Sequence, residues 1–190
     1  MSHNPGTPST FALGDALGMT FLDENRVFSD SADSVANMRD MVRRDRVHPA
    51  ILYFSFCNEA GCSGATQPAL DFKLVAEAED GSRATTMNYF WRDVEVSPNA
   101  SAIIDLQGFS HDGGGGFDAF HARYPEKPLV ASECCSCESQ RGEDSDINHN
   151  TTGNGTVTHT SFTQSCTASQ SQVSNGRAFV AGTYVWTAHE

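Results

Sequence analysis

Short apolar runs recur along the chain, and each run ends in a polar or charged residue. Buried parallel strands show this pattern, because both of their faces are covered and no alternation of apolar and polar positions is left. The run before Asn58 and Glu59 is the clearest example, since it is continuously apolar and then stops at an amide and a carboxylate. We therefore predict six strands, near residues 18–22, 51–56, 84–87, 102–106, 128–132 and 178–185.

Helical spacing appears between some of these runs. Apolar residues between positions 35 and 42 recur every three or four residues, after a serine-rich segment that offers N-caps at 29–31. A second helix is predicted over 68–79, with Leu70, Leu74 and Val75 facing the core, and a short third helix over 117–123. Strands that alternate with helices favour an α/β fold with a parallel sheet.

Length and charge narrow the possible functions. A chain of 190 residues falls in the range of one domain with a substantial core. Its net charge of −12 argues against a non-specific nucleic-acid binder and against docking on an anionic membrane. No apolar stretch is long enough to span a membrane, and the first residues show no signal-peptide pattern. The sequence leaves compartment and oligomeric state open.

The segment 138–177 differs from the rest in being dominated by Ser, Thr, Asn, Gln and Gly. We expect a long loop there, between the last two predicted strands, and long loops often border a site. Three cysteines, Cys134, Cys135 and Cys137, lie just before it. Adjacent cysteines do not easily chelate one ion, so we expect buried or redox-active thiols and no metal site.

Two carboxylates follow predicted strands directly, Glu59 after the second and Glu133 after the fifth. The carboxyl ends of parallel strands meet at one edge, so the two side chains can face the same opening. Glycoside hydrolysis needs such a pair, with one carboxyl as acid/base and the other as nucleophile in the retaining version. Helix capping and solvated carboxylates are the alternative interpretation, which spacing alone does not exclude.

The sequence around Glu59 resembles a known family signature. Residues 43–51 read RRDRVHPAI and lead to SFCNE at 55–59. This resembles glycoside hydrolase family 2, the family of β-galactosidases, β-glucuronidases and β-mannosidases, whose pattern is Arg-Asp-Arg-Asn-His-Pro-Ser, an apolar strand, and Trp-Ser-Leu-Gly-Asn-Glu. Here Phe54 stands in place of the usual Trp and Cys57 in place of the usual Gly.

Four further segments resemble the same family in the same order. SHNP at 2–5 is similar to the end of the second barrel strand, and LGM to DENR at 17–26 is similar to the third. KPLVASE at 127–133 resembles the nucleophile strand, and FVAGTYVWT at 179–187 the eighth. The resemblance implies a (β/α)8 barrel of the TIM type that is incomplete, with about six of its eight strands present, over the whole range 1–190.

Position by position, the resemblance implies that Glu59 is the general acid/base and Glu133 the nucleophile. Asn58 would bind the sugar 2-hydroxyl, His3 would contact the sugar, and Trp186 would stack on a sugar face. The alternatives are a core aromatic for Trp186 and a disordered terminal residue for His3.

His111 follows the predicted strand 102–106 and the segment 107–110 that continues it, and it is a further candidate for substrate binding. A loop histidine without a site role is an equally good interpretation. The family's magnesium ligands have no counterpart after Asp23-Glu24-Asn25, where Arg26-Val27-Phe28 follow, so we expect no metal and no cofactor.

The resemblance implies a retaining β-glycosidase that acts on a carbohydrate. No Asn-x-Lys motif follows the predicted eighth strand, where a glucuronidase would use one to meet the sugar carboxylate, and this favours a β-galactoside. β-Glucuronide and β-mannoside stay open. A different class of function, a non-catalytic remnant with at most weak glycan binding, is the alternative for an incomplete barrel, because a barrel without its first strands has exposed edges.

Overall fold

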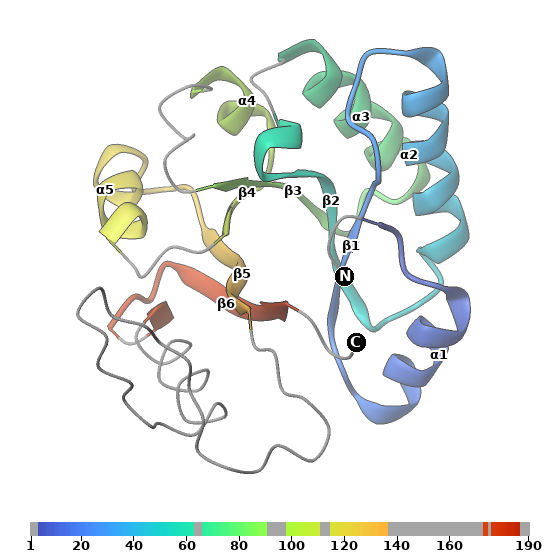
Figure 1. Cartoon of the computed structure of the whole chain (residues 1–190), viewed down its shortest axis with the longest axis horizontal. Helices are drawn as coiled ribbons and strands as arrows, with labels where there is room; N and C mark the ends of the chain where they lie inside the picture. The colour runs from blue at the N-terminus through green and yellow to red at the C-terminus, as the bar shows by residue number, and fades with distance from the viewer. Residues whose placement is uncertain are drawn as a thin grey trace, which may run out of the picture.

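The computed structural model describes residues 4–62, 66–90, 98–110, 115–136, 173–174 and 176–186 (Figure 1). The predicted polar loop 138–177 lies almost wholly outside these residues. The elements in chain order are α1 (Pro8–Leu17), β1 (Phe21–Glu24), α2 (Ala32–Asp45), β2 (Ile51–Asn58), the 3₁₀ turn η1 (Glu59–Cys62), α3 (Thr66–Glu79), β3 (Ala84–Phe90), α4 (Pro98–Ile103), β4 (Leu106–Ser110), α5 (Gly115–Arg123), β5 (Leu129–Ser136) and β6 (Val180–Trp186).

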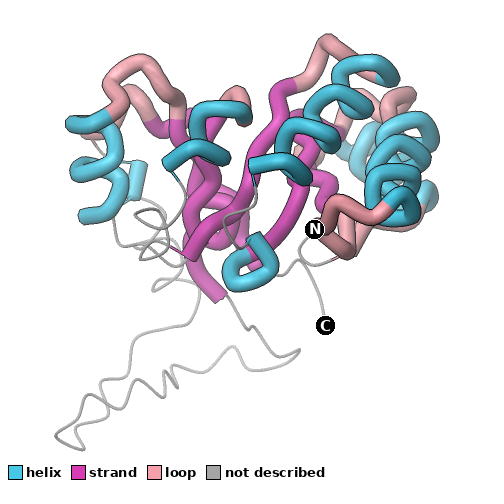
Figure 2. Tube along the Cα trace, turned by 90° about the horizontal axis from the view of Figure 1, so that it is seen from above, coloured by secondary structure: helices cyan, strands magenta, loops and turns pink. Residues whose placement is uncertain are grey.

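The strands form one six-stranded parallel sheet in the order β1-β2-β3-β4-β5-β6. The sheet is curled, and helices α2 to α5 lie along its outer face (Figures 1 and 2). The predicted α/β class is therefore confirmed, in the form of a curled half-barrel. No helix in the described ranges combines the length and apolar character that a membrane crossing requires.

One contact across the concave face measures the curl. The ring of Tyr184 on β6 lies 6.1 Å from the ring of Tyr53 on β2, although three strands separate the two in the sheet. Burial and the neighbouring Tyr53 raise the pKa of the Tyr184 phenol above its ordinary value. A side chain of the last strand thus reaches the second strand across the interior.

The fourth strand is displaced from its predicted position. The sequence predicts a strand at 102–106, but α4 ends at Ile103 and β4 begins at Leu106. Between them, the Asp105 carboxylate accepts bonds from the backbone N–H and the hydroxyl of Thr85, which fixes the entry to the strand. The apolar run at 102–104 therefore ends a helix, and its Ile104 side chain is buried in the core.

The inward face of α3 also differs from the prediction. Leu70 and Leu74 are 41% and 56% exposed, so their predicted places in the core are wrong. The buried residues of this helix include Ala69, Phe72 and Ala76. The Phe72 ring packs edge-on against Phe56 of β2 at 5.6 Å, and the two alanines let the helix approach the sheet.

Helix α1 is absent from the sequence prediction. Its N-cap is Thr7, whose hydroxyl accepts the N–H of Thr10, and its C-cap is Gly18, at a left-handed φ of 70°. Phe11 packs edge-on against Phe21 of β1 with ring centroids 5.6 Å apart. Gly14 leaves room for the same ring, because a Cβ there would lie 2.2 Å from a Phe21 ring carbon.

The motif after α2 has a structural role. The Nδ1 of His48 lies 2.6 Å from the Oδ2 of Asp15 on α1, and the Ala50 N–H donates to the same carboxylate. Arg83 donates to the carbonyl oxygens of His48 and Ile51, which ties the start of β3 to the start of β2. Residues 48–51 of the family-like motif therefore hold α1 and the start of β3 against the amino end of β2.

Candidate active site at the carboxyl edge of the sheet

Asn58 and Glu59 mark the point where β2 passes into η1. Asn58 is the last residue of the strand and is in register with Asn88 of β3, after a shift in the ladder that begins at Ser55. Glu59, the first residue of η1, has a φ of 45°, and in the described part of the chain it alone among non-glycine residues has a positive φ. Such a backbone is unfavourable for a residue with a Cβ and is common at functional sites.

Glu133 lies near the carboxyl end of β5. It is in register with Ser110 of β4 after a ladder shift, and it is 4% exposed. Strands β3 and β4 separate β2 from β5, which confirms the predicted order of the two carboxylate-bearing strands. Because all the strands are parallel, Glu59 and Glu133 belong to the same edge of one curled sheet.

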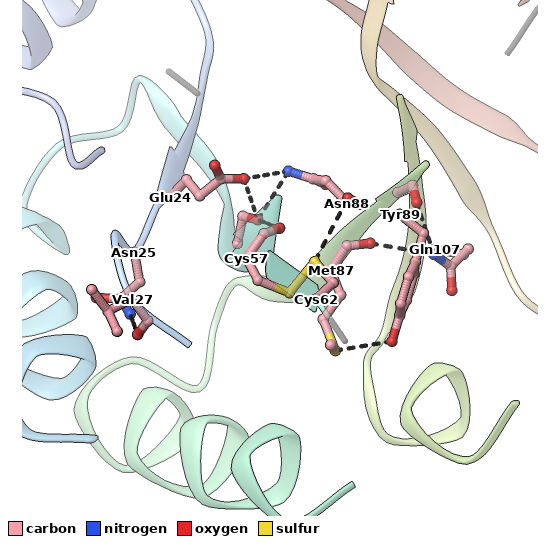
Figure 3. Close-up of a disulfide and its surroundings, with 11 residues drawn as sticks. Glu24, Asn25, Val27, Cys57, Cys62, Met87, Asn88, Tyr89 and Gln107 are labelled. Atoms are coloured by element: carbon pink, nitrogen blue, oxygen red, sulfur yellow. Dashed lines mark hydrogen bonds between the residues drawn. A yellow bond between two sulfur atoms is a disulfide. The ribbon is translucent and has the colours of Figure 1, made fainter. Parts of the chain in front are cut away.

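A buried hydrogen-bond network joins the first three strands just below this edge. The Oε2 of Glu24, on β1, accepts the Ser55 hydroxyl at 2.9 Å and the Asn88 amide at 2.6 Å. The Asn88 Nδ2 also donates to the Ser55 hydroxyl oxygen at 3.0 Å. Figure 3 shows Glu24 and Asn88 pointing toward each other from β1 and β3. Hydrogen bonds among buried polar groups are stronger than bonds exposed to water, so this network fixes the strand that carries Asn58.

Gly108 on β4 lacks a side chain at the point where Asn88 and Thr86 approach its backbone. A Cβ at this position would lie 2.2 Å from the Oδ1 of Asn88 and 2.9 Å from the Oγ1 of Thr86. Only glycine therefore fits beside these two side chains without movement of their neighbours. The sequence prediction missed Ser55 and Asn88 as site-supporting residues, although both stand at predicted strand ends.

A disulfide joins Cys57 and Cys62 and brackets the two candidate residues (Figure 3). Cys57 is 3% exposed and Cys62 is fully buried. The sequence showed the two cysteines close together and Cys57 in place of the family's glycine, but it gave no reason to pair them. Their location on either side of a strand end is the signal that could have found the bond.

A second acidic pair lies beneath the edge on the outer side of β1. Asp23 is fully buried, and its Oδ1 accepts the Gly6 N–H at 3.2 Å. Burial, together with the adjacent carboxylate of Asp45, raises the pKa of Asp23 to about 8. Asp45, also fully buried, is held by two bonds of 2.6 Å from the guanidinium of Arg44. With its pKa raised in this way, Asp23 holds a proton at neutral pH.

The other predicted site residues are His3, His111 and Trp186. His3 and His111 lie outside the described residues. Trp186 is the last residue of β6 and is in register with Ser136 of β5. Its backbone therefore lies at the same edge of the sheet as Glu133. Within the described ranges, no three His, Cys, Asp or Glu side chains gather in a group able to hold a metal ion.

Comparisons with known proteins agree with the resemblance in the sequence. No protein-family model matches the chain. A β-glucuronidase from Sus scrofa is 29% identical over 160 residues, which are 70% of this chain and 24% of that protein.

Two solved structures share the fold. A glycosyl hydrolase family 2 member from Bacteroides cellulosilyticus has a TM-score of 0.72 at 20% identity, over 99% of this chain and 23% of its own. The β-glucuronidase 2 of Bacteroides uniformis, covalently bound to cyclophellitol-6-carboxylate aziridine, has a TM-score of 0.71 at 18% identity, over 98% of this chain and 26% of its own. The resemblance to glycoside hydrolase family 2 is confirmed, and the chain spans about a quarter of the length of these relatives.

Proposed function

We propose that this chain is the site-bearing part of a retaining β-glycosidase and that its six strands form part of an eight-stranded (β/α) barrel. The observation that carries the proposal is the pair of carboxylates at one edge of the curled sheet, Glu59 after β2 and Glu133 on β5. A retaining mechanism requires two carboxyl groups about 5–5.5 Å apart across the scissile bond, and strands on opposite walls of a curl can supply them.

In this mechanism Glu133 attacks the anomeric carbon and forms the glycosyl-enzyme. Glu59 protonates the leaving oxygen and then, as a base, removes a proton from the water that hydrolyses the intermediate. The burial of Glu133 inside the curl suits a nucleophile that must be shielded from water until substrate arrives. Glu59 is only partly buried and begins a turn, where it can meet a leaving group that enters from solvent.

Asn58 has the chemistry of a substrate-binding residue. Its Oδ1 is buried and has no hydrogen-bond partner among the described residues. A sugar 2-hydroxyl can donate to this oxygen, and the bond strengthens as the sugar approaches the oxocarbenium-like transition state. The network beneath it, from Glu24 through Ser55 to Asn88, holds this strand end in place before substrate binds.

For the sugar, a terminal β-glucuronide is the first substrate to test, because the Sus scrofa relative is named a β-glucuronidase. A β-galactoside is the second candidate. A site for a uronate needs a cation that a site for galactose does not need.

Covalent labelling tests the proposal directly. The chain is incubated with 2-deoxy-2-fluoro-β-glucuronyl fluoride and, separately, with the corresponding galactosyl fluoride, and is then digested for mass spectrometry. We expect one sugar adduct on the peptide that contains Glu133, from one of the two reagents. No adduct under conditions that label a known retaining glycosidase would refute catalysis by this chain.

Matched variants separate the two carboxylates. Glu133→Gln should abolish labelling, because the attacking oxygen is lost. Glu59→Gln should keep labelling by the activated fluoride but slow turnover of glycosides with poor leaving groups by about 10²–10⁴-fold. With a substrate that has a good leaving group, azide should partly restore turnover in the Glu59 variant, because it attacks the glycosyl-enzyme without a general base and gives a β-glycosyl azide. Equal loss in both variants on every substrate would refute the assigned roles.

A further inference from the structure

We propose that the Cys57–Cys62 disulfide is a positioning device for Glu59, which holds the acid/base carboxyl in its working place. This inference rests on the proposed function for the role of Glu59, but the physical claim concerns the backbone of η1 and is testable without catalysis. The bond does not contact substrate in this proposal. It acts through the conformation of the residues that it encloses.

The disulfide closes a small ring around the site residues. The two cysteines are five positions apart, so the ring contains Asn58, Glu59, Ala60 and Gly61. The residue with the positive φ, Glu59, is therefore inside the ring. A short covalent ring excludes most of the extended conformations that a strand end could otherwise adopt, and Glu59 would relax toward them if the ring were open.

Both ends of the ring are fixed to the sheet. Cys57 is a residue of β2, two positions after Ser55, whose hydroxyl belongs to the network with Glu24. The Sγ of Cys62 lies 3.6 Å from the carbonyl oxygen of Asn88 on β3. The ring therefore spans β2 and β3, and η1 packs against both strands (Figure 3). Asn88 thus anchors the ring and also belongs to the network that supports Asn58.

The disulfide is buried, which makes it unlike an exposed redox switch. With Cys57 at 3% and Cys62 at 0% exposure, a reductant reaches the sulfurs only when the turn opens. Reduction by a dithiol breaks the S–S bond, transfers two electrons and two protons to the cysteines, and converts the dithiol to its own disulfide. We expect this reaction to be slow in the folded protein and fast once η1 has opened.

The first experiment measures the turn itself. Non-reducing peptide mapping of the full chain should find the Cys57–Cys62 linkage. Amide hydrogen exchange is then compared between the unaltered chain and Cys57→Ala/Cys62→Ala, with Cys166→Ala as a control for loss of a cysteine. We expect exchange over 57–62 to rise about tenfold or more in the double variant and not in the control. If the double variant fails to fold, the same comparison is made on the unaltered chain before and after dithiothreitol.

Two results would overturn the inference: six free thiols in the folded, air-oxidised chain, or equal exchange over 57–62 with and without the bond. The second experiment reads the catalytic consequence. Opening the ring should slow hydrolysis of a methyl β-glycoside at least tenfold more than that of a 2,4-dinitrophenyl β-glycoside, because only the poor leaving group needs the acid. An equal loss on both substrates would indicate a purely structural bond.

The two proposals fail in different ways. Absence of turnover and of labelling in the unaltered chain refutes the glycosidase proposal. The exchange data still decide whether the disulfide holds Glu59, because they need no substrate. Increased exchange in the opened ring with normal leaving-group dependence would show that the bond restrains η1 without positioning the acid, and would refute the positioning role.

Discussion

The protonated state of Asp23 gives a pH dependence of stability that a single substitution should remove. The folded chain holds this carboxyl at a pKa of about 8, against an ordinary value of 3.8, because it is buried beside the Asp45 carboxylate. Above pH 4 the unfolded chain releases the proton that the folded chain still binds. Asp23 therefore contributes stability that is fully present below pH 4 and is lost as the pH rises through 8.

The magnitude follows from linkage. Where the folded state binds one proton more than the unfolded state, the free energy of unfolding falls by about 1.4 kcal/mol per pH unit. Between pH 5 and pH 7 this single group should cost about 3 kcal/mol of stability. Asp23→Asn has nearly the same shape, keeps an oxygen for the Gly6 N–H, and cannot ionise. The variant should therefore lose this part of the decline and be more stable than the unaltered chain at pH 7.

Urea unfolding followed by circular dichroism at pH 5, 6, 7 and 8 measures the difference. The quantity of interest is the slope of the free energy of unfolding against pH, in the variant minus the unaltered chain. Asp40→Asn is the control, because the Asp40 side chain is 64% exposed and its loss should leave the slope unchanged. Parallel curves for Asp23→Asn and the unaltered chain would show that Asp23 is ionised in the folded state and would refute the reasoning.

Three further predictions concern stability. Gly108→Ala should lower the free energy of unfolding by about 1–3 kcal/mol, because the new Cβ would lie 2.2 Å from a side-chain oxygen of β3; thermal unfolding measures this, and an unchanged midpoint would contradict it. Cys57→Ala/Cys62→Ala should cost about 2 kcal/mol through the entropy of the opened ring, measured by urea unfolding with and without reductant. The hydrogen bond from Arg43 holds the pKa of Glu79 below its ordinary value, so this pair contributes stability above about pH 4.3 that is lost as the pH falls. Arg43→Ala should therefore flatten the acid side of the stability curve, and an unchanged acid limb would contradict the pairing.

Local patterns in the sequence predicted much of the fold. Continuous apolar runs located β2 and β5 to within a few residues, and Ser31 proved to be the N-cap of α2, as its place before the helical spacing indicated. The prediction failed where small residues form the packed face. On α3, Leu70 and Leu74 were expected inside but are exposed, and the buried face includes the small residues Ala69 and Ala76.

The candidate site was predictable only one strand at a time. Glu59 and Glu133 stand at strand ends that the sequence reveals, and their catalytic roles stay predictions. The bond between Glu24 and Asn88 joins residues 64 positions apart, and neither residue carries a local signal for the other. Gly108 is informative only after its neighbours are known. Helix α1 was missed because its caps, Thr7 and Gly18, flank a segment with weak amphipathic character.

The order of strands in the sheet has a consequence for how the chain folds. Every strand pairs with the strand that precedes it along the chain, from β1 to β6. Each pairing from β1 to β5 therefore closes a loop of modest length onto structure that already exists, so these strands can be added one β–α unit at a time, as the polypeptide leaves the ribosome. In that sequence the Glu24–Ser55–Asn88 network is complete once β3 has docked, before Glu133 has been translated. One half of the proposed catalytic pair would thus have its support in place while the other half is still being made.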